Sequence, residues 1–214
     1  MFPRIKLSVK LSSNITHILK IFVRSNPMKS YQITEYVHHF LECHVKPGDI
    51  CVDATMGNGN DTLKLCELVG EQGKVYAFDI QKQALENTEK RLKDHKVIHI
   101  ASLILDSHTH MDNYIVENQV DCIVFNFGYL PSGDHKLATR PETSIEAVKL
   151  GLSVLKKGGL MSLCIYSGKD SGFEERDALL TFLKDLDSKN YLVILSSYYN
   201  RPNNPPIPVM IIRR

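Results

Sequence analysis

Hydrophobic and polar residues fall into two alternating patterns along the chain. Short, nearly continuous apolar runs predict buried strands, and the stretches between them carry apolar residues at helical spacing. The runs expected to form strands are residues 50–54, 74–79, 102–106, 121–125, 160–166, 191–199 and 207–214. The stretches expected to form helices are residues 31–45, 61–69, 82–95, 141–157 and 173–188.

This alternation predicts an α/β fold. Strands that are apolar throughout must be covered on both faces, so we expect a mostly parallel, seven-stranded sheet with helices on both sides. The last two strands are joined by NRPNNPP without a helix and should form an antiparallel hairpin at one edge. Pro141 suits the start of a helix, and Gly158-Gly159 suits its C-terminal cap.

The first 27 residues differ in character from the rest of the chain. They contain no acidic residue, and their basic residues are Arg4, Lys6, Lys10, Lys20 and Arg24. Three interpretations stay open: a targeting peptide, a basic arm that contacts RNA, or upstream sequence before a true start at Met28. We favour the last, and expect residues 1–27 to be an extension and residues 28–214 to form one domain.

Charge and composition narrow the classes of protein. Without the five basic residues of the first 27 positions, the chain has 21 basic and 24 acidic residues. The rest of the chain therefore carries no net positive charge, and contact with nucleic acid would require a local basic patch. The sequence contains no run of about 18 uncharged apolar residues, so we predict no membrane span. The five cysteines lack metal-ligand spacing, and we predict no metal site. Cys51, Cys122 and Cys164 lie in apolar runs as buried thiols, which suits a reducing compartment and predicts a cytoplasmic protein.

The loop after the first strand is the first candidate binding element. It reads DATMGNGND from Asp53 to Asp61, and its glycines at 57 and 59 permit a tight turn close to a ligand. It matches neither the G-x-G-x-x-G dinucleotide fingerprint nor a phosphate loop ending in Gly-Lys-Ser/Thr. It resembles the first motif of class I methyltransferases, acid-x-Gly-x-Gly-x-Gly, with Thr55 at the first glycine. The simpler alternative is a tight strand–helix turn.

Polar residues also follow the second and third strands. Asp79 lies 20 residues after Gly59, where an acid can accept hydrogen bonds from both ribose hydroxyls, and Gln81 can reach the adenine or ribose edge. NAD enzymes share this acid. The third strand is followed by Ser107 and His108, a place where polar groups commonly meet an adenine ring. Ordinary solvated loop residues are the alternative for each.

The fourth strand ends in Asn126-Phe127-Gly128-Tyr129-Leu130-Pro131. This stretch resembles the Asn-Pro-Pro-Tyr motif of amino-group methyltransferases, in which the amide oxygen accepts hydrogen bonds from the nitrogen to be methylated. The methyl donor is intrinsically reactive, so alignment is the main task of the protein. Asn126 is therefore the candidate for orienting the amine, Tyr129 for stacking on the substrate, and Asp134 for accepting its proton. A solvated loop acid is the alternative for Asp134.

Taken together, the motifs VDATMGNGNDT, AFDIQ, DSH, FNFGYLPSGD, PETSIEAV and NNPP resemble one family. It is the bacterial tRNA 5-(aminomethyl)-2-thiouridine methyltransferases, earlier described as rRNA methylases, with a Rossmann-like class I methyltransferase fold. The resemblance implies S-adenosylmethionine as cofactor, and a tRNA anticodon stem-loop with a flipped-out wobble uridine as partner. It leaves the oligomeric state open, with a homodimer as one arrangement. The cofactor-binding residues that we expect are Asp53, Thr55, Gly57, Asn58, Gly59, Asn60, Asp61, Asp79, Gln81, Ser107 and His108.

Two departures from the family pattern concern the side that would face RNA. The family carries Tyr-His-Gly-His after the fifth strand, whereas this chain has Tyr-Ser-Gly-Lys at 166–169. The family follows its Asn-x-Pro-Pro loop with Phe, whereas here Ile207 follows Pro206. Basic residues expected on the same rim are Lys136, Arg140, Lys169 and Arg201.

Three alternative functions stay open on the residues alone. The chain could methylate rRNA or a small amine, and the changed rim residues would decide this. It could be an NAD-dependent oxidoreductase, although the spacing of the third glycine is missing. It could also be a non-catalytic module that binds the cofactor or RNA.

Overall fold

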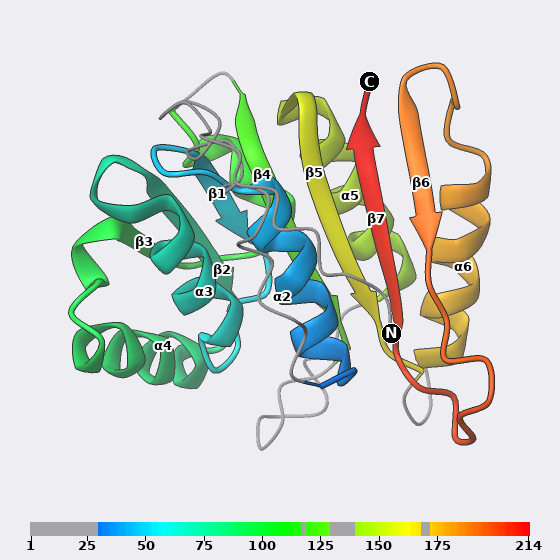
Figure 1. The fold of residues 1–214 in the computed structure, drawn as a ribbon, viewed down its shortest axis with the longest axis horizontal. Helices are drawn as coiled ribbons and strands as arrows, with labels where there is room; N and C mark the ends of the chain where they lie inside the picture. Colours follow the sequence, from blue (N-terminus) through cyan, green and yellow to red (C-terminus); the bar gives the residue numbers. More distant parts are fainter. Residues whose placement is uncertain (1–29, 117–118, 129–139, 168–171) are drawn as a thin grey trace, which may run out of the picture.

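Seven strands form one sheet in the computed structural model, which describes residues 30–116, 119–128, 140–167 and 172–214 (Figure 1). Their order across the sheet is β3-β2-β1-β4-β5-β7-β6. The strands are β1 (Ile50–Asp53), β2 (Lys74–Asp79), β3 (Ala101–Leu105), β4 (Val120–Phe127), β5 (Leu155–Ile165), β6 (Tyr191–Leu195) and β7 (Ile207–Arg213). Successive strands spread outward in opposite directions from β1 and β4, so the topological switch point lies between these two strands.

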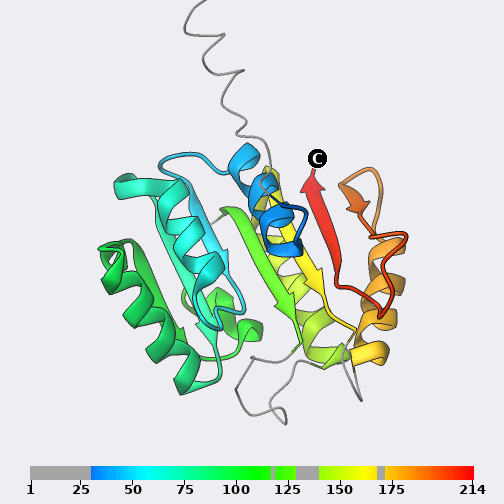
Figure 2. The same cartoon turned by 60° about the horizontal axis from the view of Figure 1, so that its bottom comes forward.

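Helices cover both faces of the sheet, as the apolar strands require (Figure 2). The α-helices of the described residues are α2 (Ile33–His44), α3 (Asn60–Val69), α4 (Lys82–Asp94), α5 (Pro141–Val154) and α6 (Gly172–Lys184). Short 3-10 helices are η1 (Gly70–Gln72), η2 (Ile98–Ile100) and η3 (His108–Asn113).

Alternate strand residues supply two separate hydrophobic cores. Ile123 and Phe125 of β4 join the core beneath α5, α6 and η3, whereas Cys122 and Val124 join the core beneath α2, α3 and α4. Both cores contain fully buried residues from the central strands. The two-sided burial explains why these strands read as continuous apolar runs.

The C-terminal strands confirm the predicted antiparallel hairpin and refine its position. β7 pairs antiparallel with β6 and also antiparallel with β5. It therefore lies between them, and β6 forms the edge of the sheet. The remaining pairs, β1 with β2 and β4, β2 with β3, and β4 with β5, are parallel.

The predicted helix cap at Gly158-Gly159 is wrong. α5 ends at Val154, and β5 begins at Leu155, so both glycines lie inside the strand. Gly158 has φ +80°, and the pairing of β5 with β4 shifts register between Val120 and Cys122. A Cβ on Gly159 would lie 2.9 Å from the carbonyl oxygen of Asp121. The two glycines thus permit an irregular start of a strand, which needs the same backbone freedom as a helix cap.

Most of the cysteines are buried, as their apolar surroundings in the sequence predict. Cys51, Cys66, Cys122 and Cys164 are buried free thiols, whereas Cys43 is exposed. No group of three or more His, Cys, Asp or Glu side chains in the described ranges could hold a metal ion. No helix in the described part of the chain is long and apolar enough to cross a membrane. Residues 1–29 lie outside the described residues, and the predicted boundary near Met28 stays a prediction.

Candidate functional site

The loop after β1 is fixed by hydrogen bonds to both neighbouring strands. The amide of Ala54 donates to the carbonyl of Val124 on β4 at 2.9 Å, and the amide of Met56 donates to Phe78 on β2 at 2.8 Å. The amide of Gly57 donates to the Asp79 carboxylate at 3.0 Å. The loop therefore lies at the carboxyl ends of β1, β2 and β4, next to the switch point where ligands bind in open α/β sheets.

Gly59 occupies a position that no other residue fits. It is the N-cap of α3 in the left-handed region, with φ 75°. A Cβ there would lie 2.8 Å from Oγ1 and 3.0 Å from Cα of Thr88 on α4. Thr88 in turn donates to the carbonyl of Gly57 at 3.1 Å. This glycine lets α4 pack directly against the loop at the N-terminus of α3, the end of a helix that favours an anionic ligand group.

Asn58 is held from the same helix. Its side-chain oxygen accepts from Asn87 Nδ2 at 2.9 Å, and its carbonyl accepts from Arg91 Nε at 2.7 Å. Neither Asn87 nor Arg91 was anticipated from the sequence, because their polar spacing on a helix is also that of a solvated face. They pre-organise the loop in its present conformation.

Asp79 ends β2 and organises two backbone amides. One carboxylate oxygen accepts from Gly57, and the other accepts from the amide of Gln81 at 3.0 Å. A carboxylate offers about four lone-pair directions, so both oxygens can accept further hydrogen bonds. The structure thus brings together the glycine loop and the strand-end acid that the sequence singled out.

His108, at the start of η3, also contacts the loop after β1. Its Nδ1 is 3.1 Å from the carbonyl oxygen of Ala54, which can only accept, so Nδ1 carries the proton. Burial lowers the pKa of this histidine and favours the neutral ring, which leaves Nε2 as an acceptor. The Ser107 hydroxyl caps η3 by accepting from the amide of Thr109 at 3.2 Å. His110 lies at the surface, where its Nδ1 is 3.0 Å from the Asp106 carboxylate.

Asp53 is fully buried beneath the loop. Its carboxylate accepts from Thr62 Oγ1 at 2.6 Å and from the amide of Thr55 at 3.2 Å. Burial, together with the nearby negative charge of Asp61, raises the pKa of Asp53 to about 7. With these partners and no exposed surface, Asp53 shapes the loop from below.

The raised pKa of Asp53 makes stability depend on pH. Because the folded value lies above the ordinary 3.8, the stabilisation is complete below about pH 4 and is lost as the pH rises towards 7. Asp53→Asn should remove this dependence, a difference of roughly 1 to 4 kcal/mol across the interval. Urea unfolding at several pH values measures it, with Asp112→Asn on the exposed surface as control. Parallel pH profiles for wild type and Asp53→Asn would contradict the assignment.

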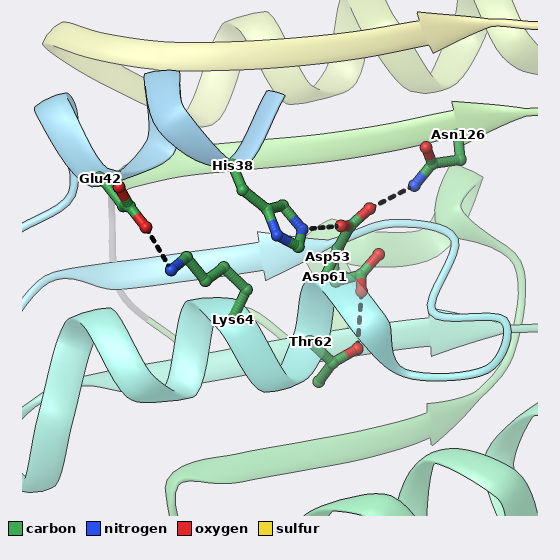
Figure 3. A network of polar contacts seen from close by, with 7 residues as sticks. All are labelled: His38, Glu42, Asp53, Asp61, Thr62, Lys64 and Asn126. Carbon is green, nitrogen blue, oxygen red and sulfur yellow. Dashed lines mark hydrogen bonds and ion pairs between the residues drawn. The ribbon is translucent and has the colours of Figure 1, made fainter. Parts of the chain in front are cut away.

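A series of hydrogen-bonded polar side chains also links α2, α3 and β4 at the switch point (Figure 3). Nε2 of His38 on α2 lies 2.5 Å from one oxygen of Asp61, which belongs to the first turn of α3. The other oxygen of Asp61 accepts from Nδ2 of Asn126 on β4 at 2.7 Å. The backbone amide of Asn126 donates to Thr55 Oγ1 at 2.7 Å, which ties this series to the glycine loop.

The structure gathers most of the predicted site residues at one edge of the sheet. Ten of the eleven predicted cofactor residues belong to the loop after β1 or are joined to it by the hydrogen bonds above, directly or through Asp79. Ser107 is the exception, since its side-chain hydrogen bonds lie within η3, and Asn60 of the loop is exposed at the start of α3. Asn126 joins them from β4. Tyr129 and Asp134 lie outside the described residues, as do Lys136 and Lys169. His38 was missed, and the only cue for it was a pair of adjacent histidines on the polar side of an amphipathic helix.

The strand order and the glycine-containing loop at the switch point are those of a class I methyltransferase. A family model described as "Putative rRNA methylase" matches residues 75–212, and the chain belongs to this family. The predicted family, fold class and enzyme class are thereby confirmed.

Three individual proteins give the degree of similarity. A chloroplastic tRNA (mnm(5)s(2)U34)-methyltransferase from Arabidopsis thaliana is 35% identical over 192 residues, which span 84% of this chain and 69% of that protein. The crystal structure of a "putative rRNA-methylase" from Clostridium thermocellum is 46% identical with a TM-score of 0.82, covering 85% of this chain and 97% of that one. A "putative methyltransferase" from Streptococcus mutans, in complex with SAH, is 38% identical with a TM-score of 0.78, covering 86% and 99%.

Proposed function

We propose that this protein methylates the aminomethyl nitrogen of 5-aminomethyl-(2-thio)uridine at the wobble position of tRNA, with S-adenosylmethionine as donor. The observation that carries the proposal is the 35% identity to the Arabidopsis enzyme over most of both chains. The arrangement of Asn126 beside the glycine loop supports it. None of the rival functions, which are methylation of rRNA or a small amine, NAD chemistry and a non-catalytic module, has comparable support.

The described residues fit the proposed cofactor. Gly59 lets the loop pack against Thr88 of α4 without a side chain between them, so the loop backbone itself lies at the N-terminus of α3. Asp79 would accept from the ribose hydroxyls, with Gln81 beside it, and Ser107 and the neutral His108 would meet the adenine. Asn58, Gly57, Thr55 and Asp53 would shape the loop, with Asn60 and Asp61 at the helix start. When bound, S-adenosylmethionine supplies an electrophilic methyl group on its sulfonium.

Asn126 would align the nucleophile. An amine attacks only through a free lone pair, so an N–H must be held elsewhere and one proton must leave. The side-chain oxygen of Asn126 can accept that N–H, because its NH₂ group already donates to Asp61. Tyr129 would stack on the flipped-out base and Asp134 would take the proton, as the sequence predicts.

The anticodon stem-loop would approach from the side of α2 and the β6–β7 connection. Tyr36 of α2 is joined to Ser196 after β6 by a 2.8 Å hydrogen bond, and the Tyr198 hydroxyl donates to the carbonyl of Tyr31. Tyr199 is fully exposed there, and Arg201 lies 4.6 Å from the Tyr198 ring. Exposed aromatic rings beside a cation suit stacked, single-stranded bases. Arg140, exposed at the N-cap of α5, would contact phosphate.

Tyr199→Ala should raise the KM for tRNA about 10-fold, since base stacking contributes about 1 to 3 kcal/mol per base. The affinity for S-adenosylmethionine should stay at the wild-type value. Steady-state kinetics with the modified tRNA measure the first effect, and calorimetry measures the second. Tyr191→Phe, at the far end of β6, serves as control. An unchanged KM would exclude this surface as the RNA contact.

A turnover assay tests the function directly. Full-length protein is incubated with S-adenosylmethionine and tRNA that carries 5-aminomethyl-2-thiouridine, and the digested nucleosides are analysed by mass spectrometry. A gain of one methyl on that nucleoside is expected. Measurable cofactor binding with no methylation would overturn the wobble assignment. A second preparation beginning at Met28 tests the domain boundary, and light scattering measures the oligomeric state, for which a homodimer is one possible arrangement.

The state of the cysteines supports the cytoplasmic location that we propose. Four buried thiols without disulfide partners suit a reducing environment, on which the predicted cytoplasmic location rests.

A further inference from the structure

His38, Asp61 and Asn126 form a chain of hydrogen bonds through three separate elements of the fold (Figure 3). The side chains of His38 and Asp61 are 20% and 13% exposed, so the contact is largely shielded from water. A shielded charge-assisted hydrogen bond is stronger and more directional than one on the surface. This series of hydrogen bonds ends at Asn126, the residue proposed to hold the substrate nitrogen.

The orientation of the Asn126 amide follows from its partner. A carboxylate only accepts, so the NH₂ end of Asn126 must face Asp61 and the oxygen must face the other way. The flipped amide would present a donor to the amine, and a donor cannot hold an N–H. The carboxylate of Asp61 therefore selects the one orientation that serves an amine substrate.

The Asp61 carboxylate needs its own anchor. It lies near the buried Asp53, and its charge contributes to the raised pKa of that residue. The N-terminus of α3 favours an anion at this position, and His38 fixes the direction of the carboxylate by donating to the oxygen that Asn126 does not use. Without this donor, the carboxylate could rotate and release the amide of Asn126.

The placement of α2 does not depend on His38. Lys64 on α3 pairs with Glu42 on α2 at 2.5 Å, and Tyr36 is bonded to Ser196. Val37 and Leu41 of the same helix are buried in the core beneath it. Replacing His38 should therefore leave the helix docked and affect the hydrogen-bonded chain alone.

We propose that His38 is a positioning residue for methyl transfer, which acts through Asp61 to hold the Asn126 amide oxygen towards the substrate amine. This inference rests on the proposed function. It assigns part of the catalytic geometry to α2, which precedes every motif that marks the methyltransferase class in the sequence.

Three variants test the inference with the full-length protein. His38→Leu should lower kcat about 10-fold to 100-fold, the loss expected from a misplaced reacting group. His38→Gln keeps an N–H donor and should recover most of kcat. His39→Leu is the matched control, since His39 is the adjacent residue and lies 4.0 Å from the exposed Glu42. The affinity for S-adenosylmethionine, the KM for tRNA and the melting temperature should stay close to wild type in all three.

The outcomes separate the inference from the function on which it rests. Absence of methylation by wild-type protein would overturn the proposed function. Methylation by wild type with an unchanged kcat in His38→Leu would overturn the inference alone. An equal loss in His38→Gln and His38→Leu would also overturn it, because the hydrogen bond would then not matter. In an Asp61→Asn background, His38→Leu should cause no further loss, and an independent second loss would contradict action through Asp61.

Discussion

Asp79→Ala is expected to weaken S-adenosylmethionine binding by about 100-fold, the largest effect on affinity in the site. The proposed hydrogen bonds to the ribose hydroxyls disappear with the carboxylate. The amides of Gly57 and Gln81 also lose their acceptor, which loosens the loop and the start of α4. One residue thus contributes directly to binding and indirectly to the shape of the site.

Calorimetric titration with S-adenosylmethionine and with SAH measures this loss. Glu86→Ala is the control, because Glu86 is an exposed acid on the neighbouring helix that pairs only with Lys82 among the described residues. Asp79→Asn should fall between wild type and Asp79→Ala, since its oxygen can still accept one hydrogen bond. An Asp79→Ala affinity within about threefold of wild type would place the ribose elsewhere.

Asn126→Ala is expected to lower kcat by about 100-fold to 1,000-fold while the affinity for S-adenosylmethionine is retained, as when one preorganised polar group is removed from an active site. The amide oxygen that would hold the N–H is lost. Removal of the NH₂ group also leaves the Asp61 carboxylate with His38 as its remaining side-chain donor. The backbone bond from residue 126 to Thr55 should persist, so the loop should keep its shape.

Single-turnover methylation of the modified tRNA separates this chemical defect from a binding defect. Asn190→Ala is a suitable control, because Asn190 lies in the exposed turn before β6 and bonds to Asp187. A wild-type rate constant in Asn126→Ala would move the amine to another part of the site. A rate loss accompanied by an equal loss of cofactor affinity would indicate a collapsed loop.

The central strands of this protein could be predicted well because they are buried on both faces. The limits of β2 matched the structure, and the missing helix before β7 correctly predicted the hairpin. The glycines at 158 and 159 misled because the positive φ of Gly158 suits a helix cap and an irregular strand equally well. Neighbouring residues could not distinguish the two, since the difference lies in how β5 pairs with β4.

The predicted site shows the same division between local and distant information. The loop glycines and Asp79 could be found because their spacing encodes a local turn and a strand end. His38 could not, because its contact with Asp61 depends on how α2 packs across α3. The hydrogen bonds from Asn87 and Arg91 to Asn58 could not be predicted for the same reason. Interactions between elements are thus the part of a site that periodicity and motifs leave undetermined.

The position of β7 has a consequence for biosynthesis. β7 follows β6 in the chain, yet it lies between β5 and β6 and bonds to both. Until β7 leaves the ribosome, β5 has an unpaired edge in the core of the sheet, and β6 has no strand to join. The nascent chain therefore exposes the edge of β5 until β7 is synthesised, and chaperones can bind there. A product truncated before residue 207 should aggregate rather than fold into a smaller enzyme.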